Sequence, residues 1–337
     1  MKKVLLTTSA LVAFAGYAAA DVSFGGEVTV GYNDIDEGGL FIDGSLDLTG
    51  TAEFDGGVSV EVTYGYDLYA GTFDNFPTVT VTTPWATLTV GDVEYAGTDM
   101  FAAVDGMATN AGDETEWREI NTEMVARVDA TFGGFTVGVS MDTGLFNPNY
   151  ATNALSIGAM GEFGAFSFTA GYDMTQNHAG TPGDDLGQYI YGFSVGTSFG
   201  GFDVDAAYQY EDHNGSNSIG LAMATTFGAA GVSAYYAINS QAPDAYGVAV
   251  DYATGPVTVG AYWDGDDSGA SNFGVDVGYE VNENISVAVG WDEGDGVYAY
   301  GLMQAGAATV GAGWANYSDA GPEEIRQGVS VWVTMPF

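Results

Sequence analysis

The residues best suited to chemistry gather in one irregular stretch, residues 95–121, and on the segment directly after it. This stretch departs from the alternating pattern of the rest of the chain. Its charged residues are Asp99, Asp105, Asp113, Glu114, Glu116, Arg118 and Glu119, and Arg127 follows a few residues later. Fixed charges of both signs can create a local field that sorts ions. Because long structured loops inside compact domains are usually functional, we expect selection by charge to centre here.

Catalytic chemistry finds little support in the sequence. The two histidines, His178 and His213, fall in expected loops, and the chain contains no cysteine. The absence of cysteine removes disulfides, thiolate nucleophiles and sulfur-ligated metal sites. We also find no glycine-rich phosphate cradle, no zinc-ligand spacing and no nucleophile elbow. We therefore expect no enzymatic activity.

One acidic segment raises a weak hypothesis of calcium binding. Asp264, Asp266 and Asp267 resemble the start of a calcium loop, because calcium prefers hard oxygen ligands. The twelfth position of such a loop would be Val275, which cannot ligate a cation, so the segment is not an EF-hand. The alternative is a solvated acidic loop, and we expect no other cofactor.

The first twenty residues have the form of a secretory signal peptide. Lys2 and Lys3 precede an apolar run, which ends in three alanines, Ala18–Ala20, before Asp21. This pattern predicts cleavage between Ala20 and Asp21 and export from the cytoplasm. We therefore expect two regions, a signal peptide over residues 1–20 and a single domain over residues 21–337.

The composition excludes nucleic acid as a partner and points to a folded chain. The formal charge of −40 becomes −42 once the two leader lysines are removed, which leaves three basic residues against 45 acidic ones. So few cations cannot replace the counterions of a nucleic-acid backbone. Hydrophobic residues make up 46% of the chain, which is too many for a disordered polymer. Beyond the leader no apolar run is long enough for a membrane helix, so a membrane-spanning form would have to be a closed strand barrel.

Alternation of apolar and polar residues continues through almost the whole mature chain. Over residues 58–66, Val58, Val60 and Val62 share one face with tyrosines, while Ser59 and Glu61 lie on the other. A period of two predicts β-strands. The polar face is predicted to carry the acids Glu27, Asp47, Glu53, Glu61, Asp129, Asp203, Asp205, Asp251 and Asp276. Arg127 and Arg326 fall on the same face by the same alternation.

Short and long connections are expected to alternate along the chain. The segments 132–135, 163–166 and 199–202 each place phenylalanine on both sides of a tight turn, which would form an aromatic ring at one rim of a barrel. Longer polar segments, such as 147–152 and 177–185, separate these hairpins. We count nine tight turns, near residues 56, 85, 133, 164, 200, 229, 255, 283 and 306. With both termini on the turn side, nine turns make twenty strands.

The end of the chain makes a family resemblance specific. Residues 328–337 alternate and end in Phe337, and this segment resembles the terminal strand that the barrel-assembly machinery of Gram-negative bacteria reads. Together with residues 82–92, the long loop after them and the Phe-Gly-Gly-Phe hairpins, the mature chain resembles the general bacterial porins of the Gram-negative outer membrane, of the alphaproteobacterial type. The resemblance covers essentially all of residues 21–337.

The resemblance carries several implications. It implies an all-β fold, a transmembrane antiparallel β-barrel in the cell outer membrane with its long third loop folded into the pore. It also implies a homotrimer, contact with outer-membrane lipid and lipopolysaccharide, and insertion by the barrel-assembly machinery with Phe337 as the assembly signal. The family has sixteen strands whereas the turn count favours twenty, so we expect a number from sixteen to twenty. Either value leaves a bore wide enough for water.

These expectations define a channel with a charged constriction. The resemblance implies that wall arginines face loop carboxylates, so the predicted constriction comprises Asp105, Asp113, Glu114, Glu116, Arg118, Glu119, Arg127 and Arg326. A wall of one sign concentrates counterions, which predicts a cation-preferring channel for passive diffusion of ions and small hydrophilic solutes. Two alternatives stay open. One is a substrate-selective channel with Trp117 and Tyr262 as a sliding surface, and the other is a plugged structural or adhesive barrel.

Overall fold

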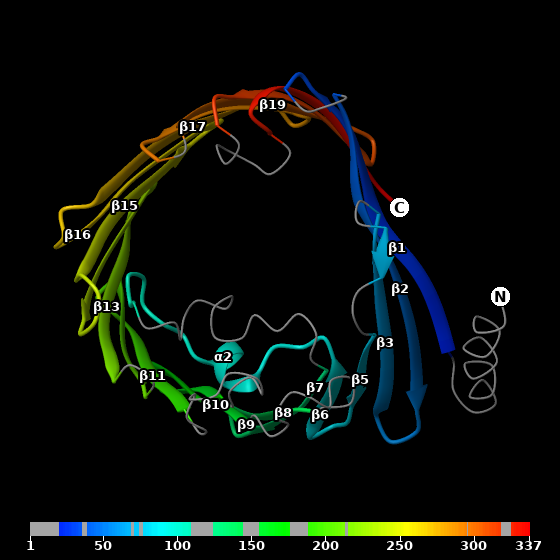
Figure 1. Cartoon of the computed structure of the whole chain (residues 1–337), viewed down its shortest axis with the longest axis vertical. Helices are drawn as coiled ribbons and strands as arrows, with labels where there is room; N and C mark the ends of the chain where they lie inside the picture. Colours follow the sequence, from blue (N-terminus) through cyan, green and yellow to red (C-terminus); the bar gives the residue numbers. More distant parts are fainter. Residues whose placement is uncertain are drawn as a thin grey trace, which may run out of the picture.

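The chain folds as a closed ring of antiparallel strands in a computed structural model (Figure 1). The structure describes residues 20–35, 39–68, 71–73, 77–108, 124–143, 155–175, 188–212, 215–294, 296–317 and 325–337. Apart from one strand of two residues, each strand pairs with its neighbours in sequence, and β1 (Ala20–Asn33) closes the ring by pairing with β21 (Gly328–Pro336). Ring closure leaves no sheet edge exposed, which is what a barrel in lipid requires.

Twenty strands form the ring within the described ranges, and β4 adds a two-residue pairing beside β3. The first eleven strands are β1 (Ala20–Asn33), β2 (Leu40–Phe54), β3 (Val58–Asp67), β4 (Thr72–Phe73), β5 (Thr78–Thr82), β6 (Ala86–Gly91), β7 (Val125–Phe132), β8 (Phe135–Asp142), β9 (Leu155–Phe163), β10 (Phe166–Thr175) and β11 (Gln188–Phe199). The others are β12 (Phe202–Glu211), β13 (Ser216–Phe227), β14 (Ala230–Asn239), β15 (Ala245–Thr254), β16 (Val257–Asp266), β17 (Ser271–Asn282), β18 (Ile285–Asp292), β19 (Gly296–Ala305), β20 (Ala308–Ala315) and β21 (Gly328–Pro336).

The strand number confirms the count of tight turns. Each predicted turn joins one hairpin, from residues 55–57 between β2 and β3 to residues 306–307 between β19 and β20. Gly133 and Gly134, for example, have φ of 59° and 93° between β7 and β8, a left-handed backbone that glycine adopts without steric cost. The sixteen strands expected from the family resemblance are wrong for this chain, because none of the nine hairpins merges with its neighbour.

The two faces of the wall differ as the alternation predicts. Val30 pairs with Ile42 on the outer face, where both are exposed, whereas Thr29 pairs with Asp43 on the inner face. Phenylalanines beside the tight turns are exposed on the outer face, namely Phe132, Phe135, Phe163, Phe166, Phe199 and Phe227. This apolar outer surface with an aromatic rim suits contact with lipid.

Helical structure is confined to a short element of the inward loop within the described ranges. Helix α2 (Ala96–Met100) has five residues. No helix in those ranges has the length and apolar character needed to cross a membrane, a finding that does not bear on crossing by strands. The structure also differs from the expectation for the acidic segment with Asp264, Asp266 and Asp267. Both interpretations of that segment make it a loop, but β16 continues to Asp266 and β17 begins at Ser271.

Candidate functional site

The candidate site begins where the chain leaves the wall after β6 and enters the ring. Residues 92–108, called here the inward loop, run inside the barrel, and α2 lies against β8, β9 and β10 (Figure 1). Residues 109–123 lie outside the described ranges, and so do five predicted constriction residues, Asp113, Glu114, Glu116, Arg118 and Glu119. Trp117 of the sliding-surface hypothesis and both histidines also lie outside them.

A row of glycines on the inner face of β8 to β11 and of β13 forms a bed for the inward loop. The row comprises Gly138 on β8, Gly158 on β9, Gly171 on β10, Gly192 on β11 and Gly220 on β13. A Cβ atom at Gly158 would lie 1.9 Å from the carbonyl oxygen of Ala96, and one at Gly171 would lie 2.3 Å from that of Gly97. Both distances are far below van der Waals contact, so only glycine lets the loop backbone lie directly on the wall.

Polar side chains of the wall hold the first turn of α2. The backbone N–H of Ala96 donates to Ser140 Oγ at 2.8 Å, and that of Gly97 donates to Ser156 Oγ at 2.6 Å. The hydroxyl of Thr98 donates to Asp173 Oδ2 at 3.0 Å. The first N–H groups of a helix have no partner within the helix, and Tyr95 provides no side-chain cap. The serines of β8 and β9 therefore replace the missing cap and fix the helix to the wall.

Apolar contacts fix the second half of the inward loop. Phe101 and Val104 are each 6% exposed and pack with Ile190 and Ala207 of the wall. Beyond them, Asn239 of β14 donates to the Gly106 carbonyl oxygen and accepts from the Ala108 N–H, both at 2.9 Å. The loop is thus held at three points in succession, by serines, by an apolar cluster and by an amide.

Arg127 lies beneath the inward loop rather than across the bore from it. The residue is on the inner face of β7, as the alternation predicts, but it is only 7% exposed. Its guanidinium pairs with Asp99 of the loop at 2.5 Å and with Asp129 of the same strand at 3.0 Å. It also donates to the Glu94 carbonyl oxygen at 3.3 Å. Two carboxylates oppose its charge at close range, so it joins the loop to the wall.

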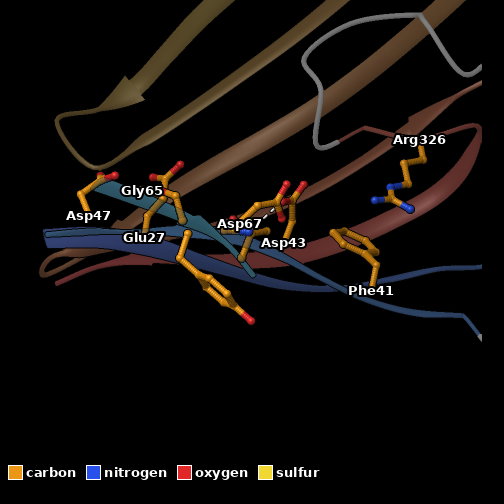
Figure 2. Close-up of a pocket in the computed structure, with 11 residues that line it drawn as sticks. Glu27, Phe41, Asp43, Asp47, Gly65, Asp67 and Arg326 are labelled. Atoms are coloured by element: carbon orange, nitrogen blue, oxygen red, sulfur yellow. Dashed lines mark hydrogen bonds between the residues drawn. The ribbon is translucent and has the colours of Figure 1, made fainter. Parts of the chain in front are cut away.

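Arg326 lies elsewhere on the inner wall, at the end of a row of carboxylates. Together with acids of β1, β2 and β3 it lines a pocket of about 420 Å³. Figure 2 shows Asp47, Glu27, Asp67 and Asp43 following one another, with Phe41 and Arg326 at one end. The guanidinium carbon of Arg326 is 4.2 Å from the centre of the Phe41 ring, a cation–π distance.

All nine predicted wall acids lie on the inner face. Strand register and alternation place there Glu27, Asp47, Glu53, Glu61, Asp129, Asp203, Asp205, Asp251 and Asp276. Asp105 of the inward loop is exposed and lines a second pocket with Asp205, Tyr235 and Asp264. In this part of the chain the inner surface presents carboxylates from both the loop and the wall.

The three acids of the calcium hypothesis have separate protein partners. Asp264 accepts from the Tyr235 hydroxyl at 3.0 Å, Asp266 accepts from the Ser268 hydroxyl at 2.6 Å, and Asp267 accepts from the backbone N–H of Asp244 at 3.1 Å. Within the described ranges no group of three or more histidine or acidic side chains is arranged to hold a metal ion. Calcium binding stays a prediction.

Sequence reasoning missed the residues that position the inward loop. The glycines of the bed, the two serines and Asn239 are uncharged, so a search for charged chemistry passes over them. One signal was present, because glycine repeatedly occupies polar-face positions of consecutive strands where a bore-facing polar side chain would be expected. Tyr262 also faces inward, and its hydroxyl donates to Asp292, which holds the ring against the wall.

The fold and the site define a class of protein. A closed antiparallel barrel with an apolar outer face, a polar and acidic inner face and a loop folded inward is a channel-forming barrel of the outer membrane. The family model for Gram-negative porins matches residues 7–272, so this chain belongs to the Gram-negative porin family. It is an outer-membrane porin, whose strands cross the membrane.

Similarity to solved structures extends along nearly the whole chain. An OmpT variant lacking one loop, from the outer membrane of Vibrio cholerae, is 11% identical with a TM-score of 0.44, covering 95% of this chain and 100% of its own. A mutant of Rhodopseudomonas blastica porin is 16% identical with a TM-score of 0.43, covering 94% and 100%. A structure from work on the asymmetric conductivity of engineered proteins is 15% identical with a TM-score of 0.45, and the match covers 94% of this chain and 100% of that structure's chain. No curated protein sequence matches the chain.

Proposed function

We propose that this porin is a cation-preferring channel for passive diffusion of ions and small hydrophilic solutes. The observation that carries the proposal is the charge of the described inner face. Nine wall acids lie there, while Arg127 is buried against two carboxylates and Arg326 stands at the end of a row of four. An inner surface of one sign raises the local concentration of counterions and repels co-ions.

The mechanism has a size limit and a charge filter. The inward loop occupies bore space beside β8–β14 and so lowers the largest solute that can pass. Carboxylates of Asp105, Asp205 and Asp264 face the passage at the loop, and the row from Asp47 to Asp43 faces it at the wall of β1–β3. Both sets favour cations. The loop acids Asp113, Glu114, Glu116 and Glu119, with Arg118, are proposed to continue this constriction.

Assembly and export belong to the same proposal. Phe337 follows β21, and its backbone N–H donates to the Gly26 carbonyl oxygen at 3.0 Å, beside the strand that closes the ring. This placement supports a role for Phe337 as the signal read during insertion. We further propose cleavage between Ala20 and Asp21, a homotrimer, and contact of the outer face with lipid and lipopolysaccharide, each supported by membership of the porin family.

The test is conductance of the refolded mature chain in a planar lipid bilayer. We expect stable current steps and, across a potassium chloride gradient, a reversal potential that favours potassium. Absence of conductance from folded protein would favour the plugged structural barrel instead. Saturation of the current by one solute class would favour the substrate-selective channel with Tyr262, and anion preference would refute the acidic filter.

A further inference from the structure

An apolar cluster inside the ring is not explained by the inward loop. It consists of Phe41, Ala315, Ile325 and Trp332, all 7% exposed or less. By register the side chains of Phe41 and Trp332 face inward, because both residues pair with Gly31, while their sequence neighbours Ile42 and Val331 are exposed outside. A buried apolar cluster on the water-facing side of a porin wall requires something to cover it.

The cover is the segment that precedes β21. Ile325 is 1% exposed, and its Cδ1 would lie 3.2 Å from a Cβ atom at Gly313, so its side chain lies over the inner face of β20. Three polar contacts hold the same segment. The Arg326 N–H donates to Ser330 Oγ at 3.2 Å, the Asn33 side chain donates to the Gln327 carbonyl oxygen at 2.9 Å, and the Gln327 side chain donates to the Asn316 carbonyl oxygen at 3.0 Å.

The consequence concerns the position of Arg326. Arg326 lies between Ile325 and Gln327, which are both attached to the wall. Its backbone is therefore fixed on the inner face. The Phe41 ring then supports the guanidinium at 4.2 Å, at one end of the carboxylate row of β1–β3 (Figure 2). The arginine is thereby set where a cation entering from that side meets the row.

We propose that residues 325–327 form a second inward-facing element of the pore, anchored by Ile325, which makes Arg326 a selectivity-determining residue at one end of the acidic row. This proposal rests on the proposed cation-preferring channel. Arg326 lowers cation preference by placing a positive charge at that end of the row, so its effect opposes that of the wall. The element lies toward β19 and β20, whereas the inward loop lies against β8–β10 (Figure 1).

Two substitutions separate the anchor from the charge. In Ile325→Ala the segment loses its apolar attachment, so we expect higher single-channel conductance, more current noise and increased cation preference. In Arg326→Met the segment stays attached, so cation preference should rise while noise is unchanged, and Arg326→Lys should restore the parent value. The matched control is Ile238→Ala, the same truncation at an outer-face position that is 50% exposed, which should leave all three properties unchanged.

A reversible disulfide bond tests directly whether Ile325 anchors the segment. The chain contains no cysteine, and Ala315 and Gln327 are bridge partners, a separation compatible with a disulfide. Ala315→Cys with Gln327→Cys, added to Ile325→Ala, should restore parent conductance when oxidised and lose it when reduced. If Ile325→Ala conducts like the parent, or if oxidation restores nothing, the second element is refuted. If the parent itself shows no cation preference, the proposed function fails, whereas the conductance and noise of Ile325→Ala still decide whether residues 325–327 form an anchored element.

Discussion

At the scale of single residues, Arg127 shows how local chemistry and position combine. Alternation alone assigns its side chain to the bore, where an isolated guanidinium would repel cations. The structure instead surrounds it with Asp99, Asp129 and the Glu94 carbonyl oxygen. Arg127 is buried whereas Asp99 is partly open to solvent, so removing the carboxylate would leave part of a buried positive charge uncompensated, which is costly. Arg127 therefore ties the loop to the wall more than it filters ions.

Arg127 could tie the loop to the wall or act as a field charge in the pore, and these two roles predict different results for Arg127→Met and Asp99→Asn. If Arg127 ties the loop, each variant should raise current noise and lower stability by about 1 kcal/mol, because the Asp99 side chain is 39% exposed and solvent screens the pair. The double variant should add little further because the same contact is already lost. If Arg127 acts as a field charge, Arg127→Met should raise cation preference and Asp99→Asn should lower it. Single-channel recordings and thermal unfolding of the four proteins decide between these outcomes.

At the scale of elements, the inward loop is positioned by glycines of the wall, which have no side chain to hold the loop away. Strands β8 to β11 and β13 present glycine on the inner face where they meet the loop, and β12 presents Ala207 there. Their missing side chains allow backbone-to-wall contact and bring Ser140 and Ser156 within reach of the first turn of α2. Glycines on the inner face of β8 to β11 and of β13 therefore mark the places where the inward loop lies against the wall.

Gly158→Val tests this principle. The added side chain would collide with the Ala96 carbonyl oxygen, so the loop should be displaced from the wall at a cost of about 1–3 kcal/mol, as in other overpacked sites. We expect altered conductance and increased current noise from a barrel that still folds. Gly231→Val is the matched control, because a Cβ atom there has its nearest neighbour at 3.9 Å. Equal behaviour of the two variants would contradict the glycine bed.

At the scale of the whole molecule, ring closure turns a local alternation into a charged passage. Each strand contributes its polar face to the same enclosed volume, so acids that are distant in sequence act together on one solute. The wall is lined in this way from β1 around to β17. The summed field depends on ionic strength, because the screening length falls from about 10 Å at 0.1 M salt to about 3 Å at 1 M.

Cation preference should therefore decline as salt rises. We expect the potassium-to-chloride permeability ratio, obtained from reversal potentials at a fixed gradient ratio, to fall toward the ratio of free mobilities between 0.1 M and 1 M potassium chloride. Single-channel conductance should rise less than in proportion to concentration, since the wall already concentrates potassium at low salt. A ratio that does not change with salt would point to a specific binding site instead of a diffuse field.

Much of this protein follows from the sequence alone, because the deciding signals are local. A period of two assigns each side chain to a face without knowledge of its neighbours, so Glu53 and Asp251 are placed on the inner wall before any strand is paired. Tight turns are equally local, which is why counting them yields the twenty strands that the structure confirms. The aromatic residues beside the turns and the alternating final strand extend the same reasoning to an outer-membrane barrel.

Tertiary structure decided where the covering elements lie and which charges they neutralise. Whether Arg127 faces open water or lies beneath Asp99 depends on the path of a loop that crosses strands far away in sequence. The burial of Ile325 against Phe41 joins segments from opposite ends of the chain, which only ring closure between β1 and β21 brings together. Local periodicity contains no information about such contacts, so the sequence determined the wall and the folded ring determined what covers it.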